Sequence, residues 1–231
     1  MSSPRVSVSV IIPTLEEAAT IATCLDHLAS QGADEVIVAD GDSADGTADL
    51  AQASGARVVR SPRGRGVQQN RGASQAGGDV LLFLHADCRL EAGSVSRLRR
   101  FVGRCPKVPG GCFRMRVDAP DLPFRTIDAA AHLRAGLAGL PYGDQGVFVP
   151  RWAFDRVGGF PEVPLMDDVY LALRLRSLGR IALLPERIYV SPRRWRRHGI
   201  LGQSLRNWSL TAAAASGVSP GVLSRFYPIV R

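Results

Sequence analysis

The chain has 231 residues, of which 45% are hydrophobic and 22% charged, and its formal net charge is +8. This composition is typical of a globular chain with a sizeable core, and it excludes a collagenous, coiled-coil or wholly disordered protein. The basic residues are 28 Arg and a single lysine, Lys107. Such charge is equally consistent with a phosphate-rich partner and with an arginine-favouring genome.

No apolar run reaches the roughly 18 residues that a membrane-spanning helix needs, and the first residues lack the apolar core of a secretory signal. We therefore expect a cytoplasmic protein. The four cysteines contain no CxxC pair and no metal-finger spacing. This favours buried free thiols over disulfides or zinc ligands.

Short apolar runs alternate with helix-like stretches over the first hundred residues. Strands are predicted at 6–12, 35–39, 56–60 and 79–84. Helices are predicted at 15–30, 45–54, 67–77 and near 91–103. Such alternation indicates βαβ units and a mainly parallel sheet, and the unbroken apolar character of the runs indicates strands that are covered on both faces.

The second half of the chain is less regular, with Gly-rich and Pro-rich connections. Strands are predicted at 111–117, 145–150 and 181–191. Helices are predicted at 123–138, 151–157 and 167–178, with one or two more between about 200 and 226. We expect this half to be continuous with the first.

Polar side chains follow three of the predicted strands. They belong to Pro13-Thr14-Leu15-Glu16, Asp40-Gly41-Asp42 and His85-Ala86-Asp87. Ligands of open α/β sheets bind at the carboxyl ends of the strands, so these residues mark the expected site. The first of these places holds neither a dinucleotide glycine fingerprint nor a P-loop, which disfavours a nicotinamide cofactor.

Five segments resemble, in order and spacing, the family-two glycosyltransferases with the GT-A fold. They are IIPTLEEAATI, VADGDSADGT, NRGASQAGGDVLLFLHAD, GDQGVFVPR and MDDVYLALRLRSLG, and they lie within residues 6–180. HAD, GDQG and the tail RRWRRHG are most similar to a small bacterial subgroup labelled as arsenosugar-biosynthesis glycosyltransferases. The resemblance implies an inverting, metal-dependent enzyme of the hexosyltransferase type that moves a sugar from a UDP- or GDP-sugar to an acceptor hydroxyl.

The resemblance also implies the domain organisation and the nucleotide site. It predicts one GT-A domain over 1–231, with a nucleotide-binding half at 1–104, an acceptor and catalytic half at 105–192, and a basic lid with helices at 193–231. In the family, the acid that closes the second strand binds the donor nucleoside, and Asp40 holds this place.

The carboxylate that binds the ribose is less defined. The family's second aspartate falls on Gly41, and Asp42 stands one position later, so Asp40 and Asp42 are both candidates. Alternatively, Asp42 caps the next helix. The other residues assigned to the nucleotide at the first strand are Pro13, Thr14 and Glu16.

The metal position of the family follows the fourth strand, where Asp87 matches the carboxylate that holds a divalent ion beside the diphosphate. Mn²⁺ and Mg²⁺ prefer such oxygen ligands. His85 replaces the first acid of the family's pattern. It is either a ligand, which suits Mn²⁺ better than Mg²⁺, or a partner of nearby backbone. His198, in the C-terminal tail, is a further candidate ligand.

An acceptor hydroxyl that attacks an anomeric carbon must lose a proton, so a general base is needed. The family uses an acid at the start of a helix, and Asp168 matches it. Asp167 orients the acceptor or caps the helix, because consecutive helical residues point about 100° apart. In the alternative interpretation, both acids only favour a helix N-terminus.

Asp144 and Gln145 are candidates for contact with sugar hydroxyls, and a β-turn without a ligand is the alternative. The tail Arg193-Arg194-Trp195-Arg196-Arg197-His198 holds the densest positive charge. Arg194 is predicted to bind the diphosphate and Trp195 to stack on a sugar or base. The competing interpretations are a solvated basic face and a patch that meets a membrane or nucleic acid. Further upstream, the predicted donor contacts are Arg65 and Arg71.

Three other function classes stay open. One is a degenerate sugar-binding relative, which the presence of Asp87 and Asp168 disfavours. A nucleotidyltransferase of the same fold usually carries a Gly-rich basic signature after the first strand, and this chain lacks one. In a basic nucleic-acid-binding module, aromatic residues are expected to alternate with the basic residues. In the arginine-rich tail at 193–198, Trp195 is the one aromatic residue. We therefore expect no nucleic-acid partner. Peripheral membrane contact is an open alternative, and the basic C-terminal segment is the part of the chain that would make it.

Overall fold

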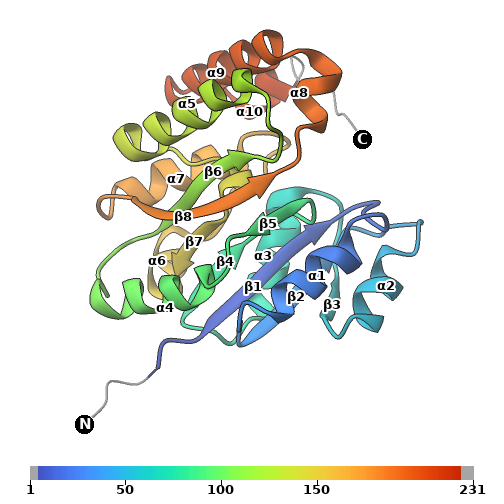
Figure 1. Ribbon diagram of the computed structural model, residues 1–231. Coiled ribbons are helices and arrows are strands. Elements are labelled where there is room, and N and C mark those ends of the chain that lie inside the picture. The colour runs from blue at the N-terminus through green and yellow to red at the C-terminus, as the bar shows by residue number, and fades with distance from the viewer. Residues whose placement is uncertain (1–4, 225–231) are drawn as a thin grey trace.

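The computed structural model describes residues 5–224, except for the side chains of Arg194, His198 and Leu201. Within this range the strands form one eight-stranded sheet in the order β3-β2-β1-β4-β7-β6-β8-β5 (Figure 1). The strands are β1 (Val8–Thr14), β2 (Glu35–Asp40), β3 (Arg57–Arg60), β4 (Val80–Phe83), β5 (Cys88–Leu90), β6 (Gly111–Val117), β7 (Val147–Pro150) and β8 (Ala182–Val190).

The sheet is mainly parallel. β1 pairs in parallel with β2 and β4, β2 pairs in parallel with β3, and β6 pairs in parallel with β8. β7 runs antiparallel to β4 and β6, and β5 runs antiparallel to β8. Strands from both halves of the chain therefore share one sheet, with the join between β4 and β7.

Helices cover both faces of the sheet (Figure 1). Their bounds are α1 (Ile21–Ala29), α2 (Thr47–Ala53), α3 (Arg65–Gln75), α4 (Ser94–Arg104), α5 (Leu122–Ala138), α6 (Arg151–Val157), α7 (Asp167–Arg176), α8 (Arg193–His198), α9 (Ile200–Ala215), α10 (Pro220–Leu223) and the 3₁₀ turn η1 (Gly143–Gln145). None of the described helices combines the length and hydropathy of a membrane span.

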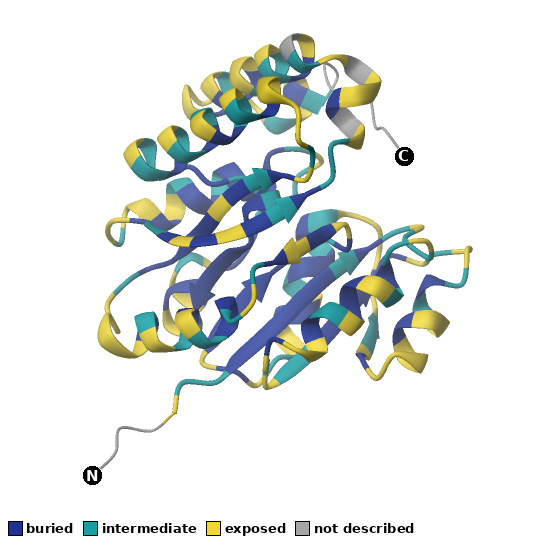
Figure 2. Ribbon diagram, in the orientation of Figure 1, coloured by how far each residue is buried: buried dark blue, intermediate teal, exposed yellow. Residues whose placement is uncertain are grey.

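Alternate residues of β1 face two separate hydrophobic cores, which explains its continuous apolar run. Val8, Val10 and Ile12 pack in a core with residues of α1 and α4, whereas Ile11 packs in a core with residues of α3, α6 and α7. Figure 2 shows the strands as the buried centre between helices with exposed outer faces. The expected two-sided burial is therefore observed.

The elements differ from the sequence-based expectation at a few places. The first helix begins at Ile21 instead of residue 15, because Glu16 adopts a left-handed φ of 57° and the loop before the helix bonds to the next loop. The short strand β5 was not predicted. Cys105 is exposed, whereas the three other cysteines are buried, and all four are free thiols.

Candidate functional site

The loops after β1 and β2 are bonded to each other. Thr14 and Asp40 are register partners at the ends of these strands, and Thr14 Oγ1 donates to Asp40 Oδ1 at 2.9 Å. The backbone N–H and hydroxyl of Ser43 donate to the same carboxylate at 2.9 and 2.6 Å. A carboxylate has about four acceptor positions. Asp40, which is buried, therefore keeps one acceptor position for a further partner.

Glu16 and Asp42 lie at the exposed rim of these two loops. The Glu16 carboxylate accepts a hydrogen bond from the backbone of Ala44 at 2.8 Å. Both residues have left-handed backbones, with φ of 57° and 64°. Among the described residues, the third non-glycine residue of this kind is Met166, directly before the acid pair of α7. Such conformations cost about 1–3 kcal/mol each and cluster at functional sites, as these three do around one edge of the sheet.

Gln68 of α3, which sequence reasoning missed, ties the two strand ends together from beneath. Its buried amide donates to the carbonyls of Thr14 and Ala39 at 2.6 and 2.9 Å. A Cβ on Gly41 would lie 3.0 Å from this amide nitrogen. The amide of Gln68 therefore occupies the space that a side chain at position 41 would need. The available signal in the sequence was the pair of adjacent glutamines, Gln68 and Gln69, within a predicted helix.

His85 and Asp168 both lie against Gly143. The backbone N–H of Gly143 donates to Asp168 Oδ2 at 2.6 Å. A Cβ on Gly143 would lie 2.9 Å from His85 Nε2 and 3.4 Å from Asp168 Oδ2. The structure thus brings the turn after β4 and the start of α7 to the same backbone position, although His85 and Asp168 are 83 positions apart in the chain. Asp87 lies two residues beyond His85 and is exposed.

The acid pair at the start of α7 has two different environments. Arg65 Nε donates to both carboxylate oxygens of Asp167 at 3.0 and 3.1 Å, and Gln69 donates to Oδ2 at 2.9 Å. Asp168 lies farther from Arg65, at 3.7 Å, and accepts hydrogen bonds from the backbone N–H of Gly143 and of Val169. Asp167 is therefore held in an ion pair with Arg65, whereas Asp168 is the acid that contacts the turn at Gly143.

Burial raises the pKa of Asp168 above its usual range. The neighbouring Asp167 carboxylate adds to the rise, while the Arg65 guanidinium opposes it. A carboxylate with a raised pKa is a stronger base than an ordinary one, so this environment suits Asp168 to accept a proton.

Three residues predicted to contact substrate have contacts within the protein in this structure, and their substrate roles stay predictions. Arg65, expected at the donor, is engaged with Asp167 because that buried acid needs a counter-charge. Gln145, expected at a sugar, is fully buried, and its amide oxygen accepts hydrogen bonds from Arg134 and from the backbone of Tyr142. Trp195, expected to stack on a sugar or base, is 8% exposed.

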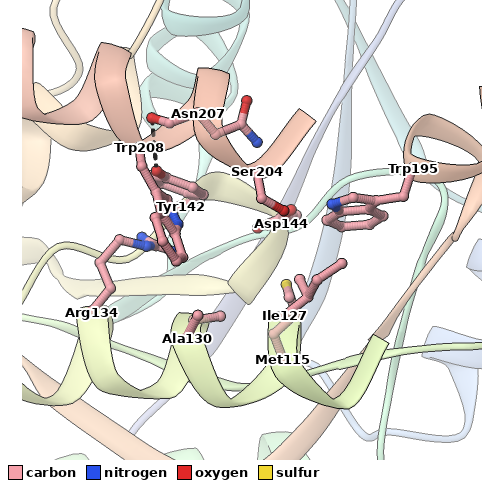
Figure 3. Close-up of a pocket in the computed structure, with 11 residues that line it drawn as sticks. Met115, Ile127, Ala130, Arg134, Tyr142, Asp144, Trp195, Ser204, Asn207 and Trp208 are labelled. Carbon is pink, nitrogen blue, oxygen red and sulfur yellow. Dashed lines mark hydrogen bonds between the residues drawn. The ribbon is translucent and has the colours of Figure 1, made fainter. Parts of the chain in front are cut away.

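Trp195 packs edge-on against Phe124, with ring centroids 6.5 Å apart. Its indole, together with Asp144 and Trp208, lines a small cavity between α5, α9 and η1 (Figure 3). Asp144 is half-buried there. The cavity measures about 40 Å³. A water molecule fits this space, whereas a sugar or nucleobase ring needs more room.

The other residues predicted to bind the donor or the metal have no described contact with His85, Gly143 or Asp168. Arg71 lies exposed on α3. The side chains of Arg194 and His198 lie outside the described residues, so their roles remain predictions. Pro13 is half-buried next to Thr14 at the end of β1.

The described side chains near Asp87 suit a divalent ion that is also bound by a substrate. In the part of the chain that the structure describes, no group of three His, Cys, Asp or Glu side chains is placed to hold a metal by itself. Mg²⁺ in nucleotide enzymes is usually bound by one or two carboxylates together with substrate phosphates and waters. The exposed carboxylate of Asp87 fits an ion that is bound together with a diphosphate.

The close approach at Gly143 gives a first prediction. Gly143→Ala is expected to lower the free energy of unfolding by about 1–3 kcal/mol, because the new methyl overlaps the His85 imidazole. Gly136→Ala is the matched control, since its methyl would lie an ordinary 3.5 Å from Leu183. Denaturant unfolding measures both variants, and equal stability of the two would contradict the geometry.

Comparisons with known proteins identify relatives of this architecture. Residues 9–156, more than half of the chain, match the family model described as Glycosyl transferase family 2. A stretch of 105 residues is 41% identical to the PGL/p-HBAD biosynthesis glycosyltransferase of Mycobacterium bovis, and an equally similar relative occurs in Mycobacterium tuberculosis. The match covers 41% of this chain and 41% of those relatives. The chain therefore matches less than half of their length.

Solved structures share the fold at low sequence identity. Mannosyltransferase PcManGT from Pyrobaculum calidifontis, in complex with GDP-Man and Mn²⁺, aligns with a TM-score of 0.66 and 23% identity, over 91% of this chain and 62% of that one. S. aureus TarS with UDP-GlcNAc aligns at 0.62 and 18%, over 80% and 58% of the two chains. Glucosyl-3-phosphoglycerate synthase from Mycobacterium tuberculosis, with Mn²⁺, UDP and phosphoglyceric acid, aligns at 0.58 and 21%, over 93% and 80%. These likenesses confirm the predicted GT-A fold.

Proposed function

The chain belongs to glycosyl transferase family 2, and from this premise we propose that it transfers a sugar from a nucleoside diphosphate sugar to an acceptor hydroxyl by one inverting displacement. Its relatives and structural neighbours are glycosyltransferases, so this chain is a glycosyltransferase. Neighbours that bind UDP, UDP-GlcNAc and GDP-Man support a nucleotide-sugar donor. The arsenosugar-type subgroup stays a prediction.

The nucleoside is proposed to bind over the ends of β1 and β2. Asp40 keeps one acceptor position for a nucleoside N–H or ribose hydroxyl, and the exposed Asp42 is the alternative partner for the ribose. The Asp40 carboxylate is already held in place by Thr14 and Ser43, so little ordering entropy is lost when the nucleoside binds. Pro13 and Glu16 border the same edge.

Asp87 is proposed to hold a divalent ion at the diphosphate, with Mn²⁺ and Mg²⁺ both compatible with its oxygen ligand. When bound, the ion offsets the negative charge that develops on the leaving nucleoside diphosphate. Neighbours that contain Mn²⁺ support metal dependence. His85 is placed to contact the same region, because its imidazole lies beside Gly143 and Asp168.

In the proposed reaction, the acceptor oxygen forms a bond to the anomeric carbon while the bond to the diphosphate oxygen breaks. The leaving diphosphate takes the electron pair, and the acceptor proton passes to the Asp168 carboxylate. Asp167 and Arg65 orient Asp168 and set its charge environment without touching the substrate. Asp144, which is half-buried beside Gly143, is proposed to contact a sugar hydroxyl from outside the small cavity that it also lines.

The observation that carries this proposal is that His85 and Asp168 both lie against Gly143. It supports a base close to the turn that bears Asp87, with the reacting carbon bound between the base and the diphosphate. This arrangement is what an in-line displacement requires.

A thermal-shift panel of nucleoside diphosphates and their sugars tests the proposal. We expect at least one nucleoside diphosphate to raise the Tm in the presence of Mn²⁺ and to do so less without it. Release of the diphosphate from the matching sugar then reports turnover. The proposal fails if no nucleotide sugar is bound or turned over with Mn²⁺ present. Binding of a nucleoside triphosphate with release of pyrophosphate would instead identify a nucleotidyltransferase.

Asp87→Asn is expected to remove the gain in nucleotide affinity that Mn²⁺ provides, because an amide oxygen is a much weaker ligand for a hard cation than a carboxylate. Titration calorimetry of the diphosphate with and without Mn²⁺ measures this gain. Asp49→Asn, on the exposed first turn of α2, is the matched control. If Asp87→Asn retains the full gain, the ion is held elsewhere.

A further inference from the structure

The entire net charge of the protein lies in its last 45 residues. Residues 1–186 contain all 21 acidic residues and 21 of the 29 basic residues, so they are neutral overall. Residues 187–231 contain eight Arg and neither Asp nor Glu. The exposed arginines of this segment on α8 are Arg193, Arg196 and Arg197. The excess positive charge is therefore concentrated in one part of the sequence, and three of its exposed arginines lie on α8.

Exposed apolar side chains gather on the helices next to this segment. On α5, Leu122, Leu133 and Leu137 are 81%, 63% and 79% exposed. At about 100° per residue, these three leucines point within roughly 60° of one another on the helix. On α9, Leu205 and Trp208 are 61% and 51% exposed and are also about 60° apart. Both helices thus present an apolar stripe to solvent.

The arginines and the two stripes form one continuous surface. Arg196 of α8 approaches Asp121 to 3.8 Å, directly before Leu122 of α5. Trp208 of α9 lines a cavity together with Ala130 and Arg134 of α5 (Figure 3). Figure 1 shows α5, α8 and α9 as a layer at the end of the molecule away from α2 and α4. We call this surface the α5/α8/α9 face, made of Leu122, Leu133, Leu137, Arg193, Arg196, Arg197, Leu205 and Trp208.

We propose that the α5/α8/α9 face docks the protein on the surface of an anionic lipid bilayer. Leucine and tryptophan side chains bury in the interfacial region of a bilayer, and arginines next to them are attracted to anionic headgroups. This surface offers both at once. The docking is peripheral, because no described helix is able to span a membrane.

The charge and the apolar side chains of this face favour an anionic bilayer over a second copy of the chain or a nucleic acid. A second copy of the chain would bring the arginines of α8 against themselves, with Asp121 offsetting one of them, and like charges across an interface are unfavourable. A nucleic acid would satisfy the arginines but leave the leucines of α5 in water, since it offers phosphates and stacked bases. An anionic bilayer satisfies both kinds of side chain.

Vesicle flotation tests the proposal with the full chain. Vesicles of phosphatidylcholine containing about one third phosphatidylglycerol are expected to carry the protein, and vesicles of pure phosphatidylcholine are expected to carry much less. Raising the salt concentration is expected to weaken the binding, because the arginine contribution is screened. Equal binding to both compositions, or no binding to either, would overturn the proposal.

Charge-reversal variants locate the surface. The triple variant Arg193→Glu, Arg196→Glu and Arg197→Glu is expected to weaken binding by about a hundredfold or more, since each arginine near an anionic surface contributes about fivefold. The control carries the same change of charge on the other side of the molecule, as Arg100→Glu, Arg104→Glu and Lys107→Glu at the end of α4. These three positions are also exposed. If the control loses as much binding as the triple variant, the attraction belongs to the whole molecule and not to this face.

Apolar variants separate a membrane from a polyanion. Leu133→Ser with Leu137→Ser is expected to weaken vesicle binding by about tenfold or more, because two exposed side chains no longer bury in lipid. Leu50→Ser with Trp152→Ser, at two exposed apolar positions outside this face, is the control and is expected to bind as the wild type. Unchanged binding of the leucine variant, together with equally tight binding of a DNA duplex, would assign the face to nucleic acid. Circular dichroism and Tm of every variant check that each one folds.

Discussion

Asp168→Asn is expected to reduce the rate of sugar transfer by about 10²–10⁴-fold, the range for loss of a general base. The amide has nearly the size of the carboxylate, and its oxygen accepts the hydrogen bond from the Gly143 backbone that Asp168 now accepts. Binding of the diphosphate with Mn²⁺ is therefore expected to stay close to that of the wild type. Steady-state release of the diphosphate and a parallel calorimetric titration measure the two effects separately.

Asp155→Asn, at an exposed position on α6, is the control for the same change of charge. It is expected to retain full activity. A variant at Asp168 that keeps more than about a tenth of the wild-type rate would contradict its role as the base. Joint loss of turnover and nucleotide binding would show that Asp168 acts on the structure of the site.

The pH dependence of the rate follows from the same residue. The deprotonated form of Asp168 accepts the proton, and burial raises its pKa above the usual value of 3.8. The rate is therefore expected to fall as the pH drops through this raised pKa, so the acid limb lies at a higher pH than an exposed aspartate would give. This limb is expected to be missing from the residual activity of Asp168→Asn.

Arg65→Met is expected to lower the free energy of unfolding by about 2–3 kcal/mol and to reduce activity as well. Removing one partner of a buried ion pair leaves an uncompensated charge, which costs about 3–5 kcal/mol when the pair is fully buried. About a third of the Arg65 side chain is exposed, whereas Asp167 is buried, so we expect the lower value. The pKa of Asp168 is expected to rise further without the guanidinium, which moves the acid limb of the rate to still higher pH.

A double variant tests the cause of this loss. Asp167→Asn in the Arg65→Met background removes the stranded charge and is expected to recover part of the stability. Arg156→Met, at an exposed position on α6, is the control and is expected to change stability by less than about 0.5 kcal/mol. A loss for Arg65→Met no larger than that of the control would show that the ion pair contributes little.

Much of the fold was predictable because the first half alternates apolar runs with helices in a regular way. The strands that begin the chain appear within two residues of their predicted bounds. The start of the first helix was not predictable, because it depends on bonds between the loops at Glu17 and Thr47 and on the left-handed backbone at Glu16. Contacts between loops leave no periodic signal in the sequence.

The site was predictable where a residue follows a strand and less so where tertiary packing decides. The positions of Asp40 and Asp87 at the carboxyl edge follow from strand ends alone. The partner of Arg65 was missed, because Asp167 lies 102 residues away in the chain and only folding joins them. Trp195 is flanked by arginines in the sequence, yet its indole is buried against Phe124, because a short helix exposes some positions and buries others.

Paramagnetic broadening by Mn²⁺ tests most directly whether the carboxyl edge is a single metal–nucleotide site. Amide spectra of isotope-labelled protein with the bound diphosphate are compared in Mn²⁺ and in diamagnetic Mg²⁺. We expect the strongest broadening around residues 85–87, with broadening also around 14–16, 40–43 and 143–144, and little at the C-terminal end of α4. Broadening centred on α8 and α9, or none when the nucleotide is bound, would contradict the proposed site.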